Sequence, residues 1–204
     1  METWNHNIHY HDLLLRAVPP NCQVALDAGC GQGVFARKLA KYSQQVIAID
    51  ADSEGLSCAR AASFAERSIA YVEGDVLSYA FSEDSFDYVA ALASLHHLPL
   101  RQAINRFREL LRSGGVLAVV GLYRLHTMQD FAFAAVAHPT SRVLRWAHGG
   151  SSQAERVEES FKDPPIREPA ETLREIGDAF TALLPGGQFE RHLLFRYSFV
   201  WRKP

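Results

Sequence analysis

The sequence predicts an α/β fold in which a mostly parallel β-sheet carries helices on both faces. Two observations support this. Between residues 24 and 122, short apolar segments alternate with amphipathic segments of helical period. After the first apolar segment, three glycines at alternate positions lead into a helical segment, which is typical of a strand–turn–helix unit. In α/β folds such units bring ligands to the carboxyl ends of the strands.

The composition fits a single domain of this kind. The chain has 204 residues, 48% of them hydrophobic, and a formal net charge of −2, which suits one well-buried core. Its basic residues are scattered, which argues against a nucleic-acid partner. The three cysteines have no paired spacing, and neither a signal-peptide pattern nor an apolar run long enough to cross a bilayer is seen. We therefore expect a soluble cytoplasmic protein without a membrane span.

The first strand and the glycine turn form the most informative segment. Residues 24–28 predict a buried strand, Gly29, Gly31 and Gly33 form the turn, and helix formers follow from Val34. Glycine suits this turn because it tolerates positive φ and lets a ligand approach the backbone. The free N–H groups of the next helix suit a polar or anionic ligand group. The segment therefore predicts a nucleotide-type cofactor site.

The spacing of the glycines narrows the choice of cofactor. The dinucleotide fingerprint is G-x-G-x-x-G, whereas this turn reads G-x-G-x-G and continues with Val34, and it lacks the Gly-Lys-Ser/Thr ending of a P-loop. With Asp27 before it, the turn resembles the first motif of the class I methyltransferases that use S-adenosylmethionine (SAM). A loop whose glycines serve only packing is the alternative.

Acidic residues follow the next two predicted strands. Asp50 ends the apolar run 45–49, about twenty residues past the first glycine, where a carboxylate can accept hydrogen bonds from both ribose hydroxyls of SAM or of NAD. Asp52 either joins it or only caps the predicted helix 53–64. After a third strand, 69–73, the Gly-Asp-Val segment resembles the family's adenine-site motif, although Gly-Asp is also an ordinary turn. That resemblance implies a hydrogen bond from adenine to Asp75.

The fourth and fifth predicted strands, 86–91 and 116–122, extend the resemblance. The "S-F-D-Y-V" segment resembles the family's central strand, and "S-L-H-H-L" after it resembles small-molecule methyltransferases, including quinone-biosynthesis types. The helix predicted over 100–111 is amphipathic, and we expect the glycines in 113–115 to end it. The "L-L-R-S-G-G-V-L" segment matches the family's motif before the fifth strand.

The remainder of the chain is predicted by pattern. Helices are expected at 130–137 and 141–148, and a helix at 171–184 precedes strands 189–195 and 197–201. These last strands resemble the family's terminal pair, so the resemblance implies a Rossmann-like, seven-stranded, mostly parallel sheet whose last strand is antiparallel. We expect one domain, 1–204, made of an N-terminal cap segment (1–20), a SAM-binding core (21–122), a variable acceptor-site or lid insertion (123–171) and a C-terminal helix and β-hairpin (172–204). Apolar residues of the insertion either line an acceptor pocket or form ordinary core; they are Phe131, Phe133, Val136, Leu144 and Trp146.

The resemblance also implies which residues contact the cofactor. The expected set is Asp27, Gly29, Cys30, Gly31, Gly33, Asp50, Ala51, Asp75, Val76, Ala91, Leu92 and, from the N-terminal segment, Tyr10. An acceptor hydroxyl or carbon acid needs a base, and histidine serves best near neutral pH. His96, after the central strand, is the first candidate, and His11 is the second. Three histidines occur between residues 6 and 11, but no second cluster accompanies them, so we expect no metal.

These residues predict a SAM-dependent methyltransferase that acts on a small-molecule acceptor by in-line displacement. An NAD-dependent oxidoreductase on a similar sheet and a non-catalytic SAM-binding protein are the two alternatives. The sequence selects neither an acceptor atom nor an oligomeric state.

Overall fold

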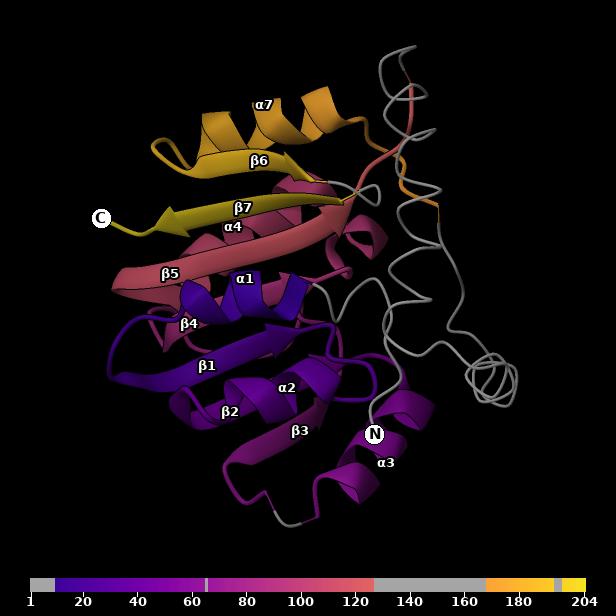
Figure 1. The fold of residues 1–204 in the computed structure, drawn as a ribbon, viewed down its shortest axis with the longest axis vertical. Helices are drawn as coiled ribbons and strands as arrows, with labels where there is room; N and C mark the ends of the chain where they lie inside the picture. The colour runs from indigo at the N-terminus through magenta and orange to yellow at the C-terminus, as the bar shows by residue number, and fades with distance from the viewer. Residues whose placement is uncertain (1–9, 65, 127–167, 193–195) are drawn as a thin grey trace, which may run out of the picture.

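The computed structural model describes residues 10–64, 66–126, 168–192 and 196–204, and within them it contains one seven-stranded sheet (Figure 1). The strands are β1 (Cys22–Ala28), β2 (Ser43–Asp50), β3 (Ile69–Glu73), β4 (Phe86–Leu92), β5 (Leu111–Leu122), β6 (Gln188–His192) and β7 (Arg196–Arg202). Their order is β3-β2-β1-β4-β5-β7-β6. The pairs from β3 to β5 are parallel, and β7 is antiparallel to both β5 and β6. The predicted Rossmann-like sheet with an antiparallel last strand is confirmed.

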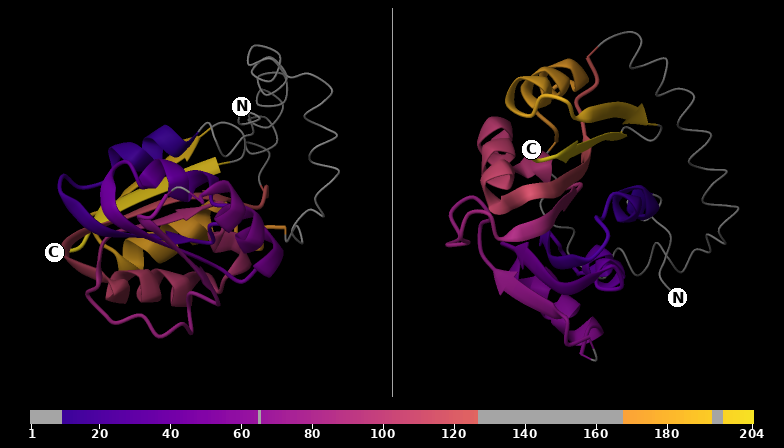
Figure 2. Two further views of the ribbon diagram at one scale, coloured as in Figure 1. Left: turned by 90° about the horizontal axis from the view of Figure 1, so that it is seen from below. Right: turned by 90° about the vertical axis from the view of Figure 1, so that its left-hand side faces the viewer.

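Helices cover both faces of this sheet, as predicted (Figure 2). The helices are α1 (His11–Arg16), α2 (Val34–Leu39), α3 (Ser53–Ala62), α4 (Leu100–Leu110), α7 (Leu173–Leu183) and the short 3₁₀ helix η2 (Leu95–His97). The buried residues of α1, α2 and α3 share one core layer, and those of α4 and α7 share the other. A central strand is therefore buried on both sides, which explains why β5 contains an unbroken apolar run.

The start of β5 differs from the prediction. We expected the glycines in 113–115 to end the preceding helix, but α4 ends at Leu110 and Leu111 is already extended. Gly114 is left-handed (φ 77°) within β5, and its N–H donates to the carbonyl of Lys203. The pairing of β4 with β5 shifts register here, from Phe86–Leu111 to Tyr88–Val116. The expected helix cap is wrong because strand pairing, rather than the helix end, uses the left-handed glycine.

Part of the predicted chain lies outside the described residues. This applies to the helices 130–137 and 141–148, to the apolar residues named for the insertion, and to most of the N-terminal histidine cluster. Among the helices in the ranges given above, none has both the length and the apolar character needed to span a membrane.

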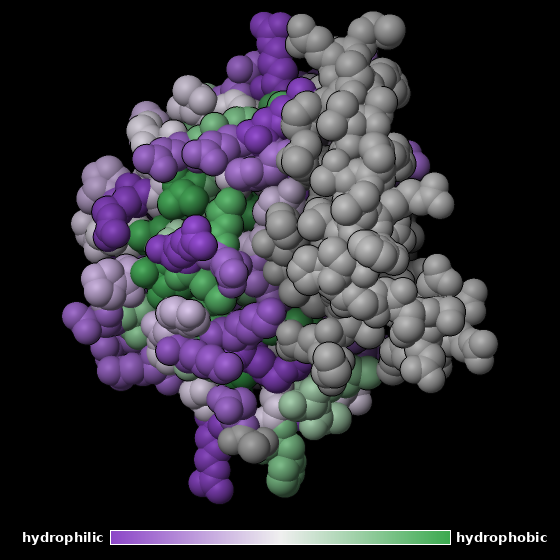
Figure 3. Space-filling model, in the orientation of Figure 1, coloured by the Kyte–Doolittle hydropathy of each residue, from purple (hydrophilic) through white to green (hydrophobic). Residues whose placement is uncertain are grey.

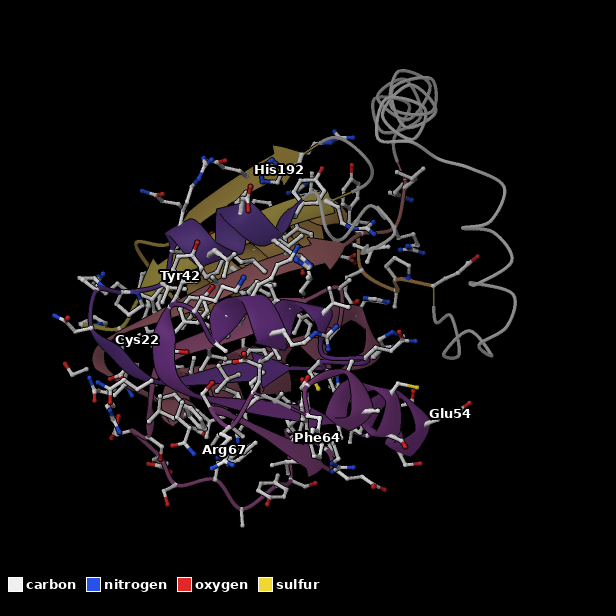
Figure 4. The ribbon with its side chains drawn as sticks, turned by 60° about the horizontal axis from the view of Figure 1, so that its bottom comes forward. Cys22, Tyr42, Glu54, Phe64, Arg67 and His192 are labelled. Atoms are coloured by element: carbon white, nitrogen blue, oxygen red, sulfur yellow. The ribbon has the colours of Figure 1, made fainter. Side chains whose placement is uncertain are left out.

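The carboxyl ends of the parallel strands meet at one edge of the sheet, on the right in Figure 1. In Figure 4, Cys22, the first residue of β1, lies at the opposite end from Glu54 in the first turn of α3. The residues predicted to bind the cofactor follow β1, β2, β3 and β4. The topology therefore brings most of them to the same edge.

Candidate functional site

The loop between β1 and α2 is a tight turn built on three left-handed glycines. Gly29, Gly31 and Gly33 have φ values of 81°, 48° and 70°. The N–H of Gly29 donates to the carbonyl of Ile49 in β2 (2.9 Å), and that of Gly33 donates to the carbonyl of Cys30 (2.8 Å). These bonds hold the loop against the end of β2.

The three glycines are needed for different reasons. A Cβ on Gly29 would overlap Ser94, and a Cβ on Gly33 would overlap the ring of Tyr71, so both positions pack tightly against the protein's own side chains. A Cβ on Gly31 would meet no heavy atom of the described residues within 4 Å. Gly31 is therefore the glycine whose Cα faces open space, where a ligand can approach the backbone.

Asp50 joins the glycine loop to the end of β3. Its Oδ2 accepts a hydrogen bond from the N–H of Gly31 (2.7 Å), and its Oδ1 accepts one from Asp52 (2.9 Å). Its backbone carbonyl accepts a hydrogen bond from Gly74 (2.9 Å). Each carboxylate oxygen has a second lone pair, so Asp50 can still accept bonds from two hydroxyls. The predicted meeting of these strand ends is present in the structure.

The neighbouring acids separate into two roles. Asp52 is the N-cap of α3, where its side chain accepts a hydrogen bond from Glu54 (3.1 Å), so the capping interpretation describes its contacts. Asp75 is exposed, and its Oδ1 accepts a hydrogen bond from the N–H of Leu77 (2.9 Å). The Gly74-Asp75 segment therefore forms a turn, which was the alternative interpretation of this motif. Val76 is buried directly after it, whereas Ala51 is exposed beside Asp50.

Asp27 is a buried carboxyl at the end of β1. Its side chain is 1% exposed, and its Oδ2 has no hydrogen-bond partner among the described residues. Burial, followed by the nearby charge of Asp50, raises the pKa of Asp27 to about 7, although the N–H of Ala36 in α2 partly opposes the shift. Burial and these acids also raise the pKa of the Cys30 thiol far above its ordinary value. Cys30 therefore lacks the thiolate character of a reactive cysteine.

The end of β4 carries the first candidate base. Ala91 is fully buried and Leu92 is half-buried, and the chain then turns into η2. His96 is half-buried in η2, with its ring 4.0 Å from that of the exposed His97. Since β4 pairs with β1, this turn adjoins the glycine loop. Ser94 Oγ donates to the carbonyl of Ala28 (2.6 Å) and makes the connection directly.

The two candidates from the N-terminal segment lie on a face of the sheet. His11 is 2% exposed and packs edge-on against Phe35 of α2, with ring centroids 5.3 Å apart. Tyr10 is buried near His192 of β6, with centroids 5.5 Å apart. These ring contacts connect His11 to α2 and Tyr10 to β6.

A hollow of about 590 Å³ lies beside Tyr10, between α1 and the strands β6 and β7. Apolar side chains gather on this face of the molecule (Figure 3). Its lining combines apolar and charged side chains, among them Leu13, Val200, Arg16 and Glu190. Within the described part of the chain, no group of three or more histidine, cysteine or acidic side chains is placed to hold a metal ion.

Two residues that pack against the glycine loop, Ser94 and Tyr71, were not predicted from the sequence. Ser94 belongs to the "S-L-H-H-L" segment, so a signal existed for it. For Tyr71 there was none, because a tyrosine in a strand pattern is typical of any sheet.

Comparisons with known proteins agree with this geometry. A family model described as "Methyltransferase domain" matches residues 26–119. Over the whole chain, an uncharacterized methyltransferase of Mycobacterium tuberculosis is 34% identical, and 98% of that protein is covered. A ubiquinone biosynthesis O-methyltransferase of Methylocella silvestris is also 34% identical, over 62% of this chain and 48% of the relative.

Solved structures share the fold over nearly the whole chain. The PH0226 protein from Pyrococcus horikoshii has a TM-score of 0.67 at 20% identity, covering 96% of this chain and 88% of that one. The N-methyltransferase NodS from Bradyrhizobium japonicum, in complex with S-adenosyl-L-homocysteine, has a TM-score of 0.63 at 19% identity. The match covers 98% of this chain and 89% of NodS. Together these matches decide between the predicted cofactors in favour of SAM. The chain belongs to the class I SAM-dependent methyltransferases, and it is an enzyme of that family.

Proposed function

We propose that this enzyme methylates a small-molecule acceptor by in-line displacement, at the sheet edge formed by β1, β2 and β4. The observation that carries the proposal is the open face of Gly31, hydrogen-bonded to Asp50 at the point where the strands meet. The similarity to a quinone-pathway O-methyltransferase supports a small acceptor. The balanced charge of the chain supports the absence of a nucleic-acid partner.

We assign the adenosine half of SAM to the loops after β1, β2 and β3. Gly31 lets the nucleoside approach the backbone, the two oxygens of Asp50 accept bonds from the ribose hydroxyls, and Asp75 with Val76 binds adenine. Asp75 Oδ1 accepts the short bond from Leu77 (2.9 Å), whereas Oδ2 accepts only a longer one from Ser78 Oγ (3.4 Å), so Oδ2 is the oxygen that we assign to the adenine amino group. The backbone of Cys30, Gly33 and Ala51 completes the binding site for the adenosine half.

The methionine half is assigned to the ends of β1 and β4. Asp27 would face its positive charge, and Gly29, Ala91 and Leu92 would form the wall beside it. Tyr10, which directly precedes α1, would cover the site from the side of β5. This assignment gives the unpartnered Oδ2 of Asp27 a cationic neighbour, which a buried carboxylate needs.

SAM brings a methyl group already activated on a sulfonium, so the protein contributes alignment and exclusion of water. The buried ends of β1 and β4 exclude water on one side of the site. His96 is the residue that we assign to remove a proton from the acceptor, because it is half-buried next to the turn that touches the glycine loop. His11 is packed against Phe35, and it remains the second candidate.

We also propose that the protein is cytoplasmic and forms a single domain over 1–204. The three cysteines, Cys22, Cys30 and Cys58, are free thiols, as expected in a reducing compartment.

An acceptor screen tests the proposed function. The purified chain is incubated with SAM and a panel of phenols, quinols, amines and carboxylic acids, and S-adenosylhomocysteine is measured. We expect acceptor-dependent formation of S-adenosylhomocysteine with at least one class. SAM binding by calorimetry without turnover of any of these acceptors would contradict the proposed small-molecule acceptor.

We expect Asp50→Ala to weaken SAM binding about 100-fold, because two charge-assisted hydrogen bonds to the ribose are lost. Isothermal titration calorimetry with SAM measures the effect. Asp52→Ala is the matched control, since it removes the cap of α3 and costs about 1 kcal/mol of stability without a predicted ribose contact. Equal losses of SAM affinity in the two variants would contradict the ribose assignment.

We expect His96→Gln to lower kcat about 100-fold or more, with the KM for SAM unchanged, because the variant removes a general base without altering cofactor contacts. Steady-state kinetics with an acceptor from the screen provide the test. His97→Gln, on the exposed neighbour in η2, should retain the wild-type rate. If only His97→Gln is slow, the base is His97.

A further inference from the structure

The turn after β4 combines a strained backbone with two bonds to neighbouring strands. Ala93 is left-handed (φ 53°), which is costly for a residue with a Cβ and persists where surrounding contacts impose it. The N–H of Ala93 donates to the carbonyl of Val120 in β5 (2.7 Å). On the other side, the hydroxyl of Ser94 donates to the carbonyl of Ala28, the last residue of β1 (2.6 Å). The turn therefore ties three central strands together at the carboxyl edge.

Ser94 also fixes the peptide that begins the glycine loop. The carbonyl of the Ala28–Gly29 peptide accepts from Ser94, and its N–H donates to the carbonyl of Ile49 in β2 (2.9 Å). This peptide is held from both sides, so it has no freedom to rotate. Moreover, a Cβ on Gly29 would overlap the Cβ of Ser94, which shows how closely the two backbones approach. The position of Gly29 therefore depends on Ser94.

The same residue leads into the segment that holds the candidate base. Ser94 is the N-cap of η2, and its carbonyl accepts a hydrogen bond from the N–H of His97 (3.1 Å). His96 lies between them. Ser94 therefore connects two segments: its side chain binds the beginning of the glycine loop, and its backbone carbonyl binds the segment of His96.

We propose that Ser94 is a positioning residue for the methionine half of SAM. Its hydroxyl fixes the Ala28–Gly29 peptide, and thereby sets the distance between the amino-acid end of the cofactor and His96. This inference rests on the proposed function. The adenosine half is assigned to Gly31, Asp50 and Asp75, and the hydrogen bonds described for Ser94 reach none of these three. The two halves of the cofactor should therefore respond differently to a change at Ser94.

The test uses two ligands and needs no acceptor. S-adenosylhomocysteine carries both halves, whereas 5′-methylthioadenosine lacks the amino-acid end. By calorimetry, we expect Ser94→Ala to lower the affinity for S-adenosylhomocysteine about tenfold, since one well-made hydrogen bond is worth roughly that factor. The affinity for 5′-methylthioadenosine should be unchanged. Ser113→Ala is the control, because Ser113 Oγ donates to the carbonyl of Pro204 over the same 2.6 Å and lies near the start of β5.

Ser94→Cys keeps the shape of the side chain with a weaker donor, so it should lose less affinity for S-adenosylhomocysteine, again with none lost for 5′-methylthioadenosine. This variant also serves if Ser94→Ala does not fold. Equal losses for both ligands, or no loss for either, would overturn the positioning role. Failure of the wild-type protein to bind S-adenosylhomocysteine would overturn the proposed function instead.

Discussion

Gly31→Val should weaken SAM binding roughly 100-fold while the protein still folds. The described residues place no atom within 4 Å of a Cβ built on Gly31, and this is the space assigned to the nucleoside. A valine side chain there would occupy the volume of the nucleoside. Forcing the two to overlap costs about 3 kcal/mol of binding free energy, which is roughly 100-fold in affinity. Titration calorimetry with SAM measures the loss, and circular dichroism reports whether the sheet is retained.

Backbone strain must be separated from this steric effect. Valine at Gly31 would adopt positive φ (48°), which costs about 1–2 kcal/mol of stability wherever it occurs. Gly114→Val is the matched control, because Gly114 is also left-handed (φ 77°) and also has open space beside its Cα, at the start of β5. Both variants should melt at a lower temperature, and only Gly31→Val should lose SAM. If Gly114→Val loses SAM equally, the strain is responsible and the placement of the cofactor is wrong.

The sequence was sufficient to predict the sheet because each strand carries its own local signal. Uninterrupted apolar runs indicate strands that are buried on both faces, and the glycine turn indicates where the sheet binds its ligand. The one clear error arose at Gly114, where a left-handed glycine between a helix and a strand fits either element. Only the pairing with Lys203, which is distant in sequence, shows that this glycine belongs to β5.

The distinct roles of the glycines depend on contacts that sequence spacing does not contain. Gly29, Gly31 and Gly33 form one motif in the sequence, yet two of them pack against Ser94 and Tyr71 and only Gly31 is open. In the same way, Asp50 and Asp52 are two residues apart and appear equivalent. In the structure one of them holds the glycine loop, and the other caps a helix. Tertiary packing assigns these roles.

A second large effect is expected at Asp27, whose pKa of about 7 lies well above the ordinary value of 3.8. The folded protein therefore retains a proton on Asp27 that the unfolded chain releases between about pH 4 and pH 7, so the contribution of this group to stability falls as pH rises through that window. The full cost, present above pH 7, is on the order of 4 kcal/mol. The amide of Asp27→Asn cannot ionise, so the variant should not bear this free-energy cost.

Urea unfolding of the ligand-free protein at pH 5 and pH 8 measures this cost. The free energy of unfolding of Asp27→Asn, relative to wild type, should rise by about 2–3 kcal/mol between the two pH values, because part of the cost is already present at pH 5. The groups that act on Asp27, namely Asp50 and the N–H of Ala36, are retained in the variant. Asp178→Asn, at a side chain that is 75% exposed in α7, should show no comparable rise. Parallel pH dependence of wild type and Asp27→Asn would contradict the raised pKa.

SAM should reverse this penalty. Its sulfonium and ammonium groups are positive, so a cofactor placed beside Asp27 favours the ionised carboxylate, and binding then releases a proton when the pH is below about 7. Wild-type affinity for SAM should rise from pH 6 to pH 8, whereas the affinity of Asp27→Asn should be lower and should lack this rise. Calorimetry in buffers of different ionisation enthalpy counts the released protons. An equal number released by both proteins would place the methionine half away from Asp27, even if Gly31 and Asp50 hold the nucleoside as proposed.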